Sequence, residues 1–164
     1  MTTTERTLVV LKPDAVARGL VGRLLQRFED VGVKIVGVKM KLMDADFTER
    51  HYFDLATRRG AAVYAATSAF MRQSPVIALV LEGVEAVSQV RRMVGNTYPS
   101  EAAIGTIRAD FAHVSKAYCQ ERDQAVANLV HASGTVEEAT HEINLWFSVD
   151  ELFDYQTAAE RFTF

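Results

Sequence analysis

The chain has very little cysteine and no long apolar run. Cys119 is the only cysteine among 164 residues, so no intrachain disulfide can form. A lone thiol favours a reducing compartment, and we therefore expect a cytoplasmic protein. No apolar run reaches the length of a membrane span, and no signal-peptide hydrophobic region precedes the first expected strand. A membrane is therefore not an expected partner.

Positively charged residues are fewer than negatively charged ones. The chain carries 18 Lys and Arg against 21 Asp and Glu, for a formal net charge of -3 at pH 7. A protein that holds nucleic acid by bulk charge needs the opposite balance, so nucleic acid is not expected as the primary partner. The two common phosphate motifs, G-x-x-x-x-G-K-[ST] and G-x-G-x-x-G after a strand, are missing. Their absence excludes a P-loop enzyme, although a local basic pocket for phosphates remains possible.

The apolar residues are plentiful and strongly patterned. They make up 49% of a chain that is long enough for one sizeable core and short for two domains, so we expect a single domain over residues 1–164. Continuous or alternating apolar runs predict strands, and apolar residues at helical spacing predict helices. Strands are expected at 7–11, 33–42, 75–82 and near 129, helices at 20–28, 46–56, 61–71, 84–94 and 136–146, and an irregular stretch at 99–127.

This order of elements, β-α-β-(αα)-β-α-β, predicts an α+β fold. Two helices covering one face of a mixed or antiparallel sheet give the ferredoxin-like split β-α-β arrangement, with a four-stranded, mainly antiparallel sheet covered by helices. Because this fold hosts many functions, the function has to be argued from a site.

One histidine lies in a setting that suits chemistry. Residues 128–135 bring His131 from the end of an apolar run into a turn of small residues. Thr135 and Glu138 fit a capping box, so a helix is expected to begin close to His131. The unpaired N–H groups of a helix start favour an anion. Seen alone, however, such a histidine is more often a satisfied core or turn residue.

Cationic and hydroxyl residues follow the ends of several expected elements. Each alone is more often solvated or in a weak surface pair than functional. These residues are Lys12, Tyr52, Arg58, Arg91, Thr97 and Arg108. Of the other histidines, we expect His51 to be structural, while His113 and His141 lie in the long connection and on the last helix. None has metal-ligand spacing with a partner, so neither a zinc site nor any other metal bound directly by the protein is expected.

Together these stretches resemble the nucleoside diphosphate kinase family. The matching stretches are 5–14, 18–22, 51–52, 74–76, 81–83, 105–111 and 128–133, followed by Glu142 and Ile143. They occur in order over nearly the whole chain, which makes the resemblance far more specific than any one short pattern.

The resemblance implies a reaction and assigns a role to three residues. His131 matches the nucleophile, which takes the terminal phosphate of a nucleoside triphosphate, typically ATP, as phosphohistidine and passes it to a nucleoside diphosphate. Such a covalent intermediate predicts ping-pong kinetics. Glu142 matches the carboxylate that holds the other ring nitrogen, and Ser133 matches the hydroxyl that supports it. From spacing alone, Glu142 could equally be a solvated helix residue.

The resemblance also implies how the moving phosphate is stabilised. Phosphoryl transfer spreads negative charge, which positioned cations and donors can stabilise. By resemblance, Lys12 and Asn128 organise the sugar and the transferring phosphate, and Tyr52 lies near the transferred group. The expected phosphate-binding residues are Arg58, Arg91, Thr97 and Arg108. Mg²⁺ is the implied cofactor, bridging nucleotide phosphates with few direct protein ligands.

The chain departs from the family pattern at several places. The stretch that follows Arg58 is longer than usual, so Val63 or Tyr64 is expected to take the base-stacking role, and Arg59 could replace Arg58. Residues 112–127 form a longer loop insert before the histidine, interpreted as a lid, a helical insert or a subunit contact. Two further changes, Ala132 and Gly134, flank the histidine turn and replace the family's usual glycine and aspartate.

The end of the chain predicts self-association. Residues 148–164 form a C-terminal extension whose apolar side chains could pack on a neighbouring surface. They are Leu152, Phe153, Tyr155, Phe162 and Phe164. Because the family is typically oligomeric, we expect a homo-oligomer.

Two other functions remain open to test. An RNA-recognition module shares the expected topology, but it needs exposed aromatics on its central strands, and residues 7–11 and 76–81 contain none. The second is a catalytically silent relative that binds nucleotides or regulates a partner. Since every matched catalytic position is present, we expect an enzyme.

Overall fold

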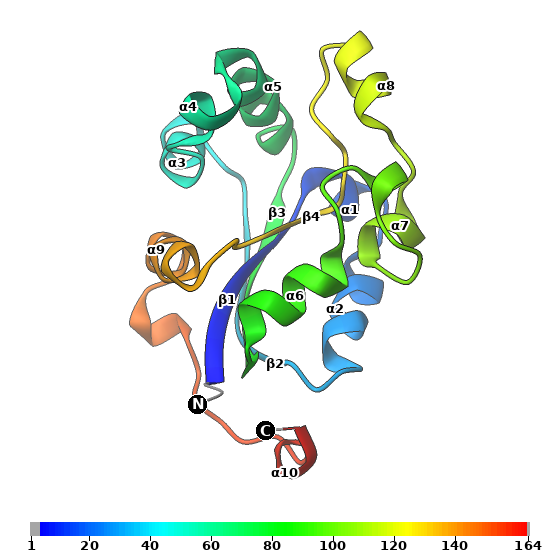
Figure 1. Cartoon of the computed structure of the whole chain (residues 1–164). Coiled ribbons are helices and arrows are strands. Elements are labelled where there is room, and N and C mark those ends of the chain that lie inside the picture. The colour runs from blue at the N-terminus through cyan, green and yellow to red at the C-terminus, as the bar shows by residue number, and fades with distance from the viewer. Residues whose placement is uncertain (1–3, 164) are drawn as a thin grey trace.

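The computed structural model describes residues 4–163 and has a four-stranded antiparallel sheet at its centre (Figure 1). The strands are β1 (Thr4–Leu11), β2 (Lys34–Lys41), β3 (Val76–Val84) and β4 (Val130–Ala132), in the spatial order β2-β3-β1-β4. Central β1 pairs with β3 along its whole length and with β4 at Val9 to Leu11, antiparallel in both cases. The predicted α+β fold with a four-stranded antiparallel sheet is confirmed.

Helices connect and cover the strands. They are α1 (Pro13–Ala17), α2 (Val21–Glu29), α3 (Ala45–His51), α4 (Leu55–Arg59), α5 (Ala61–Met71), α6 (Ala86–Val94), α7 (Ile107–Phe111), α8 (Lys116–Glu121), α9 (Val136–Trp146) and α10 (Glu160–Thr163), with 3-10 turns η1 (Pro99–Glu101) and η2 (Val149–Glu151). Helices α5 and α9 have the predicted bounds. No described helix has both the length and the apolar character needed to cross a membrane.

Three predictions about the helices were wrong. The helix expected at 46–56 is divided into α3 and α4, and the helix expected from Val84 begins two residues later because Glu85 has a positive φ of 49°. The stretch 99–127 is not irregular, since it contains η1, α7 and α8. The last two are short helices with side-chain caps, in which Thr106 accepts from the amide of Ala109 and Ser115 accepts from the amide of Tyr118.

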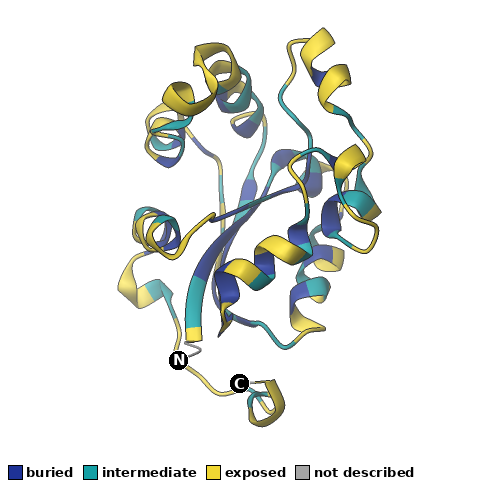
Figure 2. Cartoon of the chain, in the orientation of Figure 1, coloured by how far each residue is buried: buried dark blue, intermediate teal, exposed yellow. Residues whose placement is uncertain are grey.

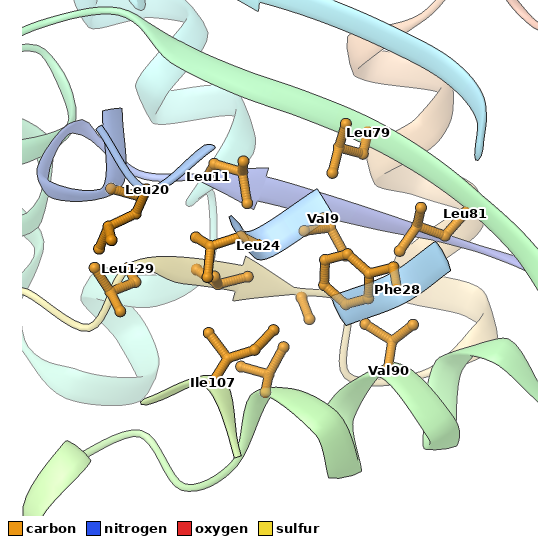
Figure 3. Close-up of a cluster of buried hydrophobic side chains, with 14 residues drawn as sticks. Val9, Leu11, Leu20, Leu24, Phe28, Leu79, Leu81, Val90, Ile107 and Leu129 are labelled. Carbon is orange, nitrogen blue, oxygen red and sulfur yellow. The ribbon is translucent and has the colours of Figure 1, made fainter. Parts of the chain in front are cut away.

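Hydrophobic clusters lie on both faces of the sheet, whereas the sequence predicted helices on one. The first core, on the face of α2 and α6, contains Val9, Leu11, Ala15, Leu20, Leu24, Phe28, Leu79, Leu81, Val90, Val94, Ile107, Leu129, Val130 and Ala132 (Figure 3). The second core, on the face of α9, contains Leu8, Val10, Val36, Met43, Met71, Val76, Ala78, Val80, Ile143, Trp146 and Phe147. Residues 8–11 have no exposed surface, so β1 needs apolar cover on both sides (Figure 2).

The C-terminal extension runs along one end of β2. The amide of Phe153 donates to the carbonyl of Val36 over 2.8 Å, and the Tyr155 hydroxyl donates to the carbonyl of Ile35 over 2.6 Å. Lys34 forms ion pairs with Glu82 at 2.9 Å and with Glu160 at 3.1 Å. The extension therefore packs on its own sheet at this end. Of the apolar tail residues predicted to pack on a neighbour, Phe164 lies outside the described residues.

Replacing Gly37 with alanine is expected to lower the free energy of unfolding by about 1–3 kcal/mol, because the site is fully packed. A Cβ atom at Gly37 would lie 2.8 Å from Leu152 Cδ2 and 3.3 Å from the carbonyl oxygen of Glu151. The matched control is Gly22→Ala in α2, where a Cβ meets nothing within 4 Å. The control should gain roughly 0.5–1 kcal/mol, because glycine is unfavourable inside a helix. Urea unfolding measures both, and equal stability of the two variants would contradict this packing.

Candidate active site

His131 lies in the middle of β4 and opposite Val10 of β1, not in the turn after the strand as predicted. Side chains alternate between the two faces of a strand. Since Val130 and Ala132 both belong to the first core, His131 is turned to the opposite face, toward α9. The departure at Ala132 therefore adds a small side chain to the first core rather than to the surroundings of the imidazole.

Glu142 of α9 orients the imidazole. Its Oε1 lies 2.8 Å from His131 Nε2, and its Oε2 accepts from the Ser133 hydroxyl over 2.6 Å. The amide of Leu8 donates to Ser133 Oγ over 3.2 Å, which ties this network to β1. An ionised carboxylate can only accept, so Nε2 carries the proton and Nδ1 keeps a free lone pair. The structure thus brings His131, Glu142 and Ser133 together as the sequence predicted.

Glu142 stays ionised although it is only 3% exposed. Burial opposes its charge, but His131, His51 and the Ser133 hydroxyl outweigh burial and lower the pKa of Glu142 to about 2. A carboxylate next to the imidazole favours any positive charge that develops on the ring.

His51 and Trp146 close the site on the second-core side. The Trp146 indole donates to His51 Nδ1 over 3.2 Å, and the ring centroids of His51 and His131 lie 4.7 Å apart. Burial, reinforced by His131, lowers the pKa of His51 to about 3, so His51 stays neutral. Ligand atoms of His51, His131 and Glu142 lie within 4.8 Å of one another, a spacing that a metal ion could use. His131 and Glu142 bond to each other and His51 Nδ1 accepts from Trp146, while His51 Nε2 is buried without a hydrogen-bond partner among residues 4–163. That the protein binds no metal directly stays our prediction.

Tyr52 borders the same space. Its ring centroid lies 6.1 Å from that of His131, and burial, followed by Glu142, raises the pKa of its hydroxyl. Tyr52 is therefore a neutral hydrogen-bonding group beside the imidazole.

Lys12 and Asn128 form a polar pair at the end of β1. Lys12 Nζ donates to Asn128 Oδ1 over 2.7 Å, and Asn128 Nδ2 donates to the carbonyl of Thr97 over 2.7 Å. Burial and the nearby Arg108 lower the pKa of Lys12 to about 8, against an opposing effect of Asp14. This ammonium group therefore loses its charge unusually easily.

Arg108 of α7 supports the backbone around the histidine as well as supplying charge. Its guanidinium donates to the carbonyls of Gly95 at 2.9 Å, Asn128 at 3.3 Å and Val130 at 2.6 Å. Burial and Arg91 lower the pKa of Arg108 to about 10, which leaves it charged at neutral pH. Gly95 lets the beginning of α7 lie this close to it. A Cβ at Gly95 would lie 2.5 Å from an atom of Thr106, the residue that caps α7.

The remaining predicted nucleotide-binding residues lie further out. The Arg91 guanidinium reaches the carbonyl of Ala132 at 3.4 Å. Arg58 is exposed and forms two hydrogen bonds with Asp54, at 2.5 and 3.0 Å, one turn earlier in the chain. Val63, which is 47% exposed, and Tyr64 lie near the beginning of α5. The structure does not place Arg58, Val63 or Tyr64 against the imidazole, so their roles stay predictions.

The expected helix start after the histidine is present, and side chains of the same turn occupy two of the amides around it. Thr135 accepts from the amide of Glu138 over 3.1 Å, as predicted for the N-cap. Glu138 reaches back to the amide of Gly134 over 2.6 Å. A carboxylate thus occupies the place where an anion was expected. A Cβ at Gly134 would meet only the movable ends of side chains, of which that of Glu138 is nearest at 2.5 Å, so nothing in the structure explains this departure from the family pattern.

Two contributors to the site were missed by sequence reasoning. Asp14 lies in the matching stretch 5–14 but has no predicted role, and its carboxylate accepts from the amide of Leu129 over 3.0 Å. Trp146 was read as the end of a helix, but it fixes His51. The position of Asp14 next to Lys12 was a usable signal for the first. Nothing in the sequence pointed to the second.

The fold and the site together define a phosphotransferase: a small α+β enzyme with a carboxylate-oriented imidazole next to buried cations. Comparison with known proteins makes this class specific. The sequence model of the family described as nucleoside diphosphate kinase matches residues 5–152. A nucleoside diphosphate kinase of Pyrococcus horikoshii is 45% identical over 162 residues, which cover 99% of this chain and 97% of the relative.

Solved structures agree with the sequence comparisons. A transition-state mimic of the nucleoside-diphosphate kinase of Borrelia burgdorferi, with bound vanadate and ADP, has a TM-score of 0.93 and 39% identity, and covers 96% of this chain and 95% of its own. The enzyme of Halobacterium salinarum in complex with CDP has a TM-score of 0.84 and 35% identity, and covers 97% of both chains. This chain belongs to the nucleoside diphosphate kinase family. It transfers the terminal phosphate of a nucleoside triphosphate to nucleoside diphosphates.

Proposed function

We propose that His131 Nδ1 is the atom that carries the phosphoryl group between the two nucleotides. The observation that carries this proposal is the 2.8 Å contact of His131 Nε2 with Glu142, which leaves Nδ1 as the free lone pair. In the first step, Nδ1 bonds to the terminal phosphorus and the bond from that phosphorus to the bridging oxygen breaks. In the second, a terminal oxygen of the acceptor diphosphate attacks the phosphorus, and the N–P bond breaks.

The surrounding residues stabilise this transfer. The positive charge that forms on the phosphorylated ring faces Glu142, while Lys12 and Arg108 supply cations for the phosphate oxygens. Tyr52 and Asn128 contribute neutral donors, Arg91, Arg58 and Thr97 contact the outer phosphates, and Val63 or Tyr64 stacks on the base. The relative that binds vanadate with ADP supports an in-line transfer in this fold.

Mg²⁺ fits as a partner of the nucleotide rather than of the protein. The carboxylates of Glu142, Glu138 and Asp54 are committed to His131, the Gly134 amide and Arg58. Few carboxylate oxygens therefore remain for the ion near the imidazole, and its phosphate-bound form needs few. The ion would supply positive charge for the nucleotide phosphates, beside that of Lys12 and Arg108.

Labelling with ATP that carries a radioactive terminal phosphate tests the proposed function. We expect an acid-labile phosphoenzyme, transfer of the label to added GDP or CDP, and loss of labelling in EDTA that Mg²⁺ restores. A protein that binds ATP and never becomes labelled would be a catalytically silent relative, and that outcome would overturn the proposal.

Catalytic efficiency, kcat/KM for the nucleotide, is expected to fall as the pH rises through about 8, because Lys12 then loses its proton. The efficiency falls because a neutral amine gives no electrostatic attraction to a phosphate anion. Lys12→Arg should move this alkaline limb upward, because an arginine stays protonated. Steady-state rates between pH 6 and 10 measure it, and an unchanged limb in Lys12→Arg would assign the limb to another group.

We also propose that the enzyme is a homo-oligomer that uses the free part of the β2 edge. The C-terminal extension covers β2 at Ile35 and Val36. Further along, the apolar side chains of Val38, Met40 and Leu42 are 55%, 60% and 62% exposed. An exposed apolar edge strand favours pairing with another chain.

Met40→Asp is expected to shift the protein toward smaller species in sedimentation velocity, because it introduces a charge into this edge. The matched control is Val149→Asp, at an isolated valine that is 89% exposed on η2. An unchanged distribution in Met40→Asp, or an equal shift in both variants, would argue against the β2 edge.

We also propose how the chain is organised, what it binds and in which compartment it acts. Residues 1–164 form one domain, with 112–127 as an insert that carries α8 and 148–164 as the extension. Its two hydrophobic clusters share one sheet, which supports this view. The working partners are nucleoside tri- and diphosphates, and the single free Cys119 supports the cytoplasm as the compartment.

A further inference from the structure

The residue two positions before His131 has an unusual backbone. Leu129 has a positive φ of 71°, and the amide of Val130 donates to the carbonyl of Asn128 over 2.8 Å. The result is a three-residue turn of the type with positive φ, which is rare and strained. A leucine in this region of φ is an outlier that needs support from its surroundings.

This turn sets which way the catalytic side chains face. In a regular strand Leu129 and His131 would share one face. In the structure Leu129 lies in the first core (Figure 3) together with the next residue, Val130, and His131 faces α9 instead. The turn therefore buries Leu129 and still presents the imidazole to Glu142. If it straightened, either Leu129 or His131 would leave its place.

Residues that follow β1 hold both polar groups of Leu129. Its amide donates to Asp14 Oδ2 over 3.0 Å, and its carbonyl accepts from the amide of Lys12 over 2.8 Å. The second contact is between backbone atoms, so no side chain can replace it. The first depends on the Asp14 carboxylate alone.

We propose that Asp14 is a positioning residue for the transfer reaction, because its carboxylate holds the strained turn that aims His131 and Asn128. This inference rests on the proposed role of His131. Asp14 does not contact the imidazole in the structure; it acts through Leu129. It also carries a negative charge next to the cationic side of the site.

The charge of Asp14 adds a second, separable effect. Its Oδ1 is buried without a hydrogen-bond partner among residues 4–163. The charged groups that face Lys12 are Asp14 and Arg108, and His51 is close but neutral. Of these, only Asp14 favours the protonated form of Lys12. Removing the charge while keeping the acceptor should therefore change the response of Lys12 to pH and leave the turn intact.

Two substitutions of Asp14 separate these effects. Asp14→Ala removes the acceptor, and we expect the Leu129 amide to exchange with solvent at least about tenfold faster and kcat/KM to fall about 10²-fold, the cost of a small misplacement. Asp14→Asn keeps an oxygen for that amide. It should keep the protection of Leu129 while the alkaline limb of kcat/KM moves to lower pH. Asp30→Asn, at the exposed end of α2, is the matched control.

Hydrogen exchange of the assigned Leu129 amide and pH profiles of the full chain provide the readouts. Unchanged protection and unchanged kcat/KM in Asp14→Ala would overturn the proposal. If Asp14→Ala does not fold, Asp14→Asn decides: loss of Leu129 protection in that variant, which keeps an acceptor oxygen, overturns the proposal. A limb in Asp14→Asn that coincides with that of wild type refutes only the separate effect of the charge on Lys12. If the wild-type protein forms no phosphoenzyme, the proposed role of His131 is refuted instead. The exchange measurement would still report on the turn.

Discussion

His131→Ala is expected to lose phosphoenzyme labelling completely and to reduce nucleotide exchange by at least about 10⁴-fold, because removing a nucleophile removes both half-reactions. The variant should still bind nucleotide, since Lys12, Asn128 and Arg108 are held by contacts that do not involve the imidazole. Labelling with ATP and titration with ADP measure the two properties separately.

His113→Ala is the matched control for that experiment. His113 is exposed in the segment between α7 and α8, so its loss removes an imidazole without touching the site. We expect wild-type labelling in this variant. Labelled His131→Ala, or a His113→Ala variant without label, would place the phosphohistidine elsewhere in the chain.

Much of the fold could be predicted from apolar spacing. The bounds of α5 and α9 follow from it, and β1 was identified by an apolar run on both of its faces. The same run implies cover on both faces, whereas the order of elements predicts helices on only one. Short helices such as α7 and α8 were missed because their few residues show no period, and only their caps, Thr106 and Ser115, mark them.

The site was predictable where resemblance supplied partners and was not where backbone geometry decides. His131, Glu142 and Ser133 meet as expected. The prediction that His131 lies in a turn after the strand was wrong. Leu129, two residues earlier, has a positive φ, and composition does not signal this conformation. A sequence also cannot show that one guanidinium donates to three backbone carbonyls, as that of Arg108 does.

The orientation of the imidazole depends on one hydroxyl proton. Ser133 Oγ lies 3.2 Å from the amide of Leu8, which donates to it, and 2.6 Å from Glu142 Oε2. The Ser133 proton is therefore directed to Oε2, and the other carboxylate oxygen is left for His131 Nε2. The other acceptor within reach of Ser133 is the carbonyl of Leu8, which is further away at 3.4 Å, so we expect a side chain at position 142 to accept from Ser133 on one side.

Glu142→Gln should consequently reverse the tautomer of His131 rather than merely weaken its contact. With the amide oxygen accepting from Ser133, the amide NH₂ points at Nε2, which must then accept, and the proton moves to Nδ1. A protonated Nδ1 cannot attack phosphorus. We expect phosphoenzyme formation to slow by about 10³–10⁴-fold, the loss seen when an orienting carboxylate becomes an amide. Imidazole ¹⁵N shifts report the tautomer directly, and Glu137→Gln, on the exposed first turn of α9, is the matched control. A Glu142→Gln variant that keeps the Nε2–H form and labels at the wild-type rate would show that packing alone orients His131.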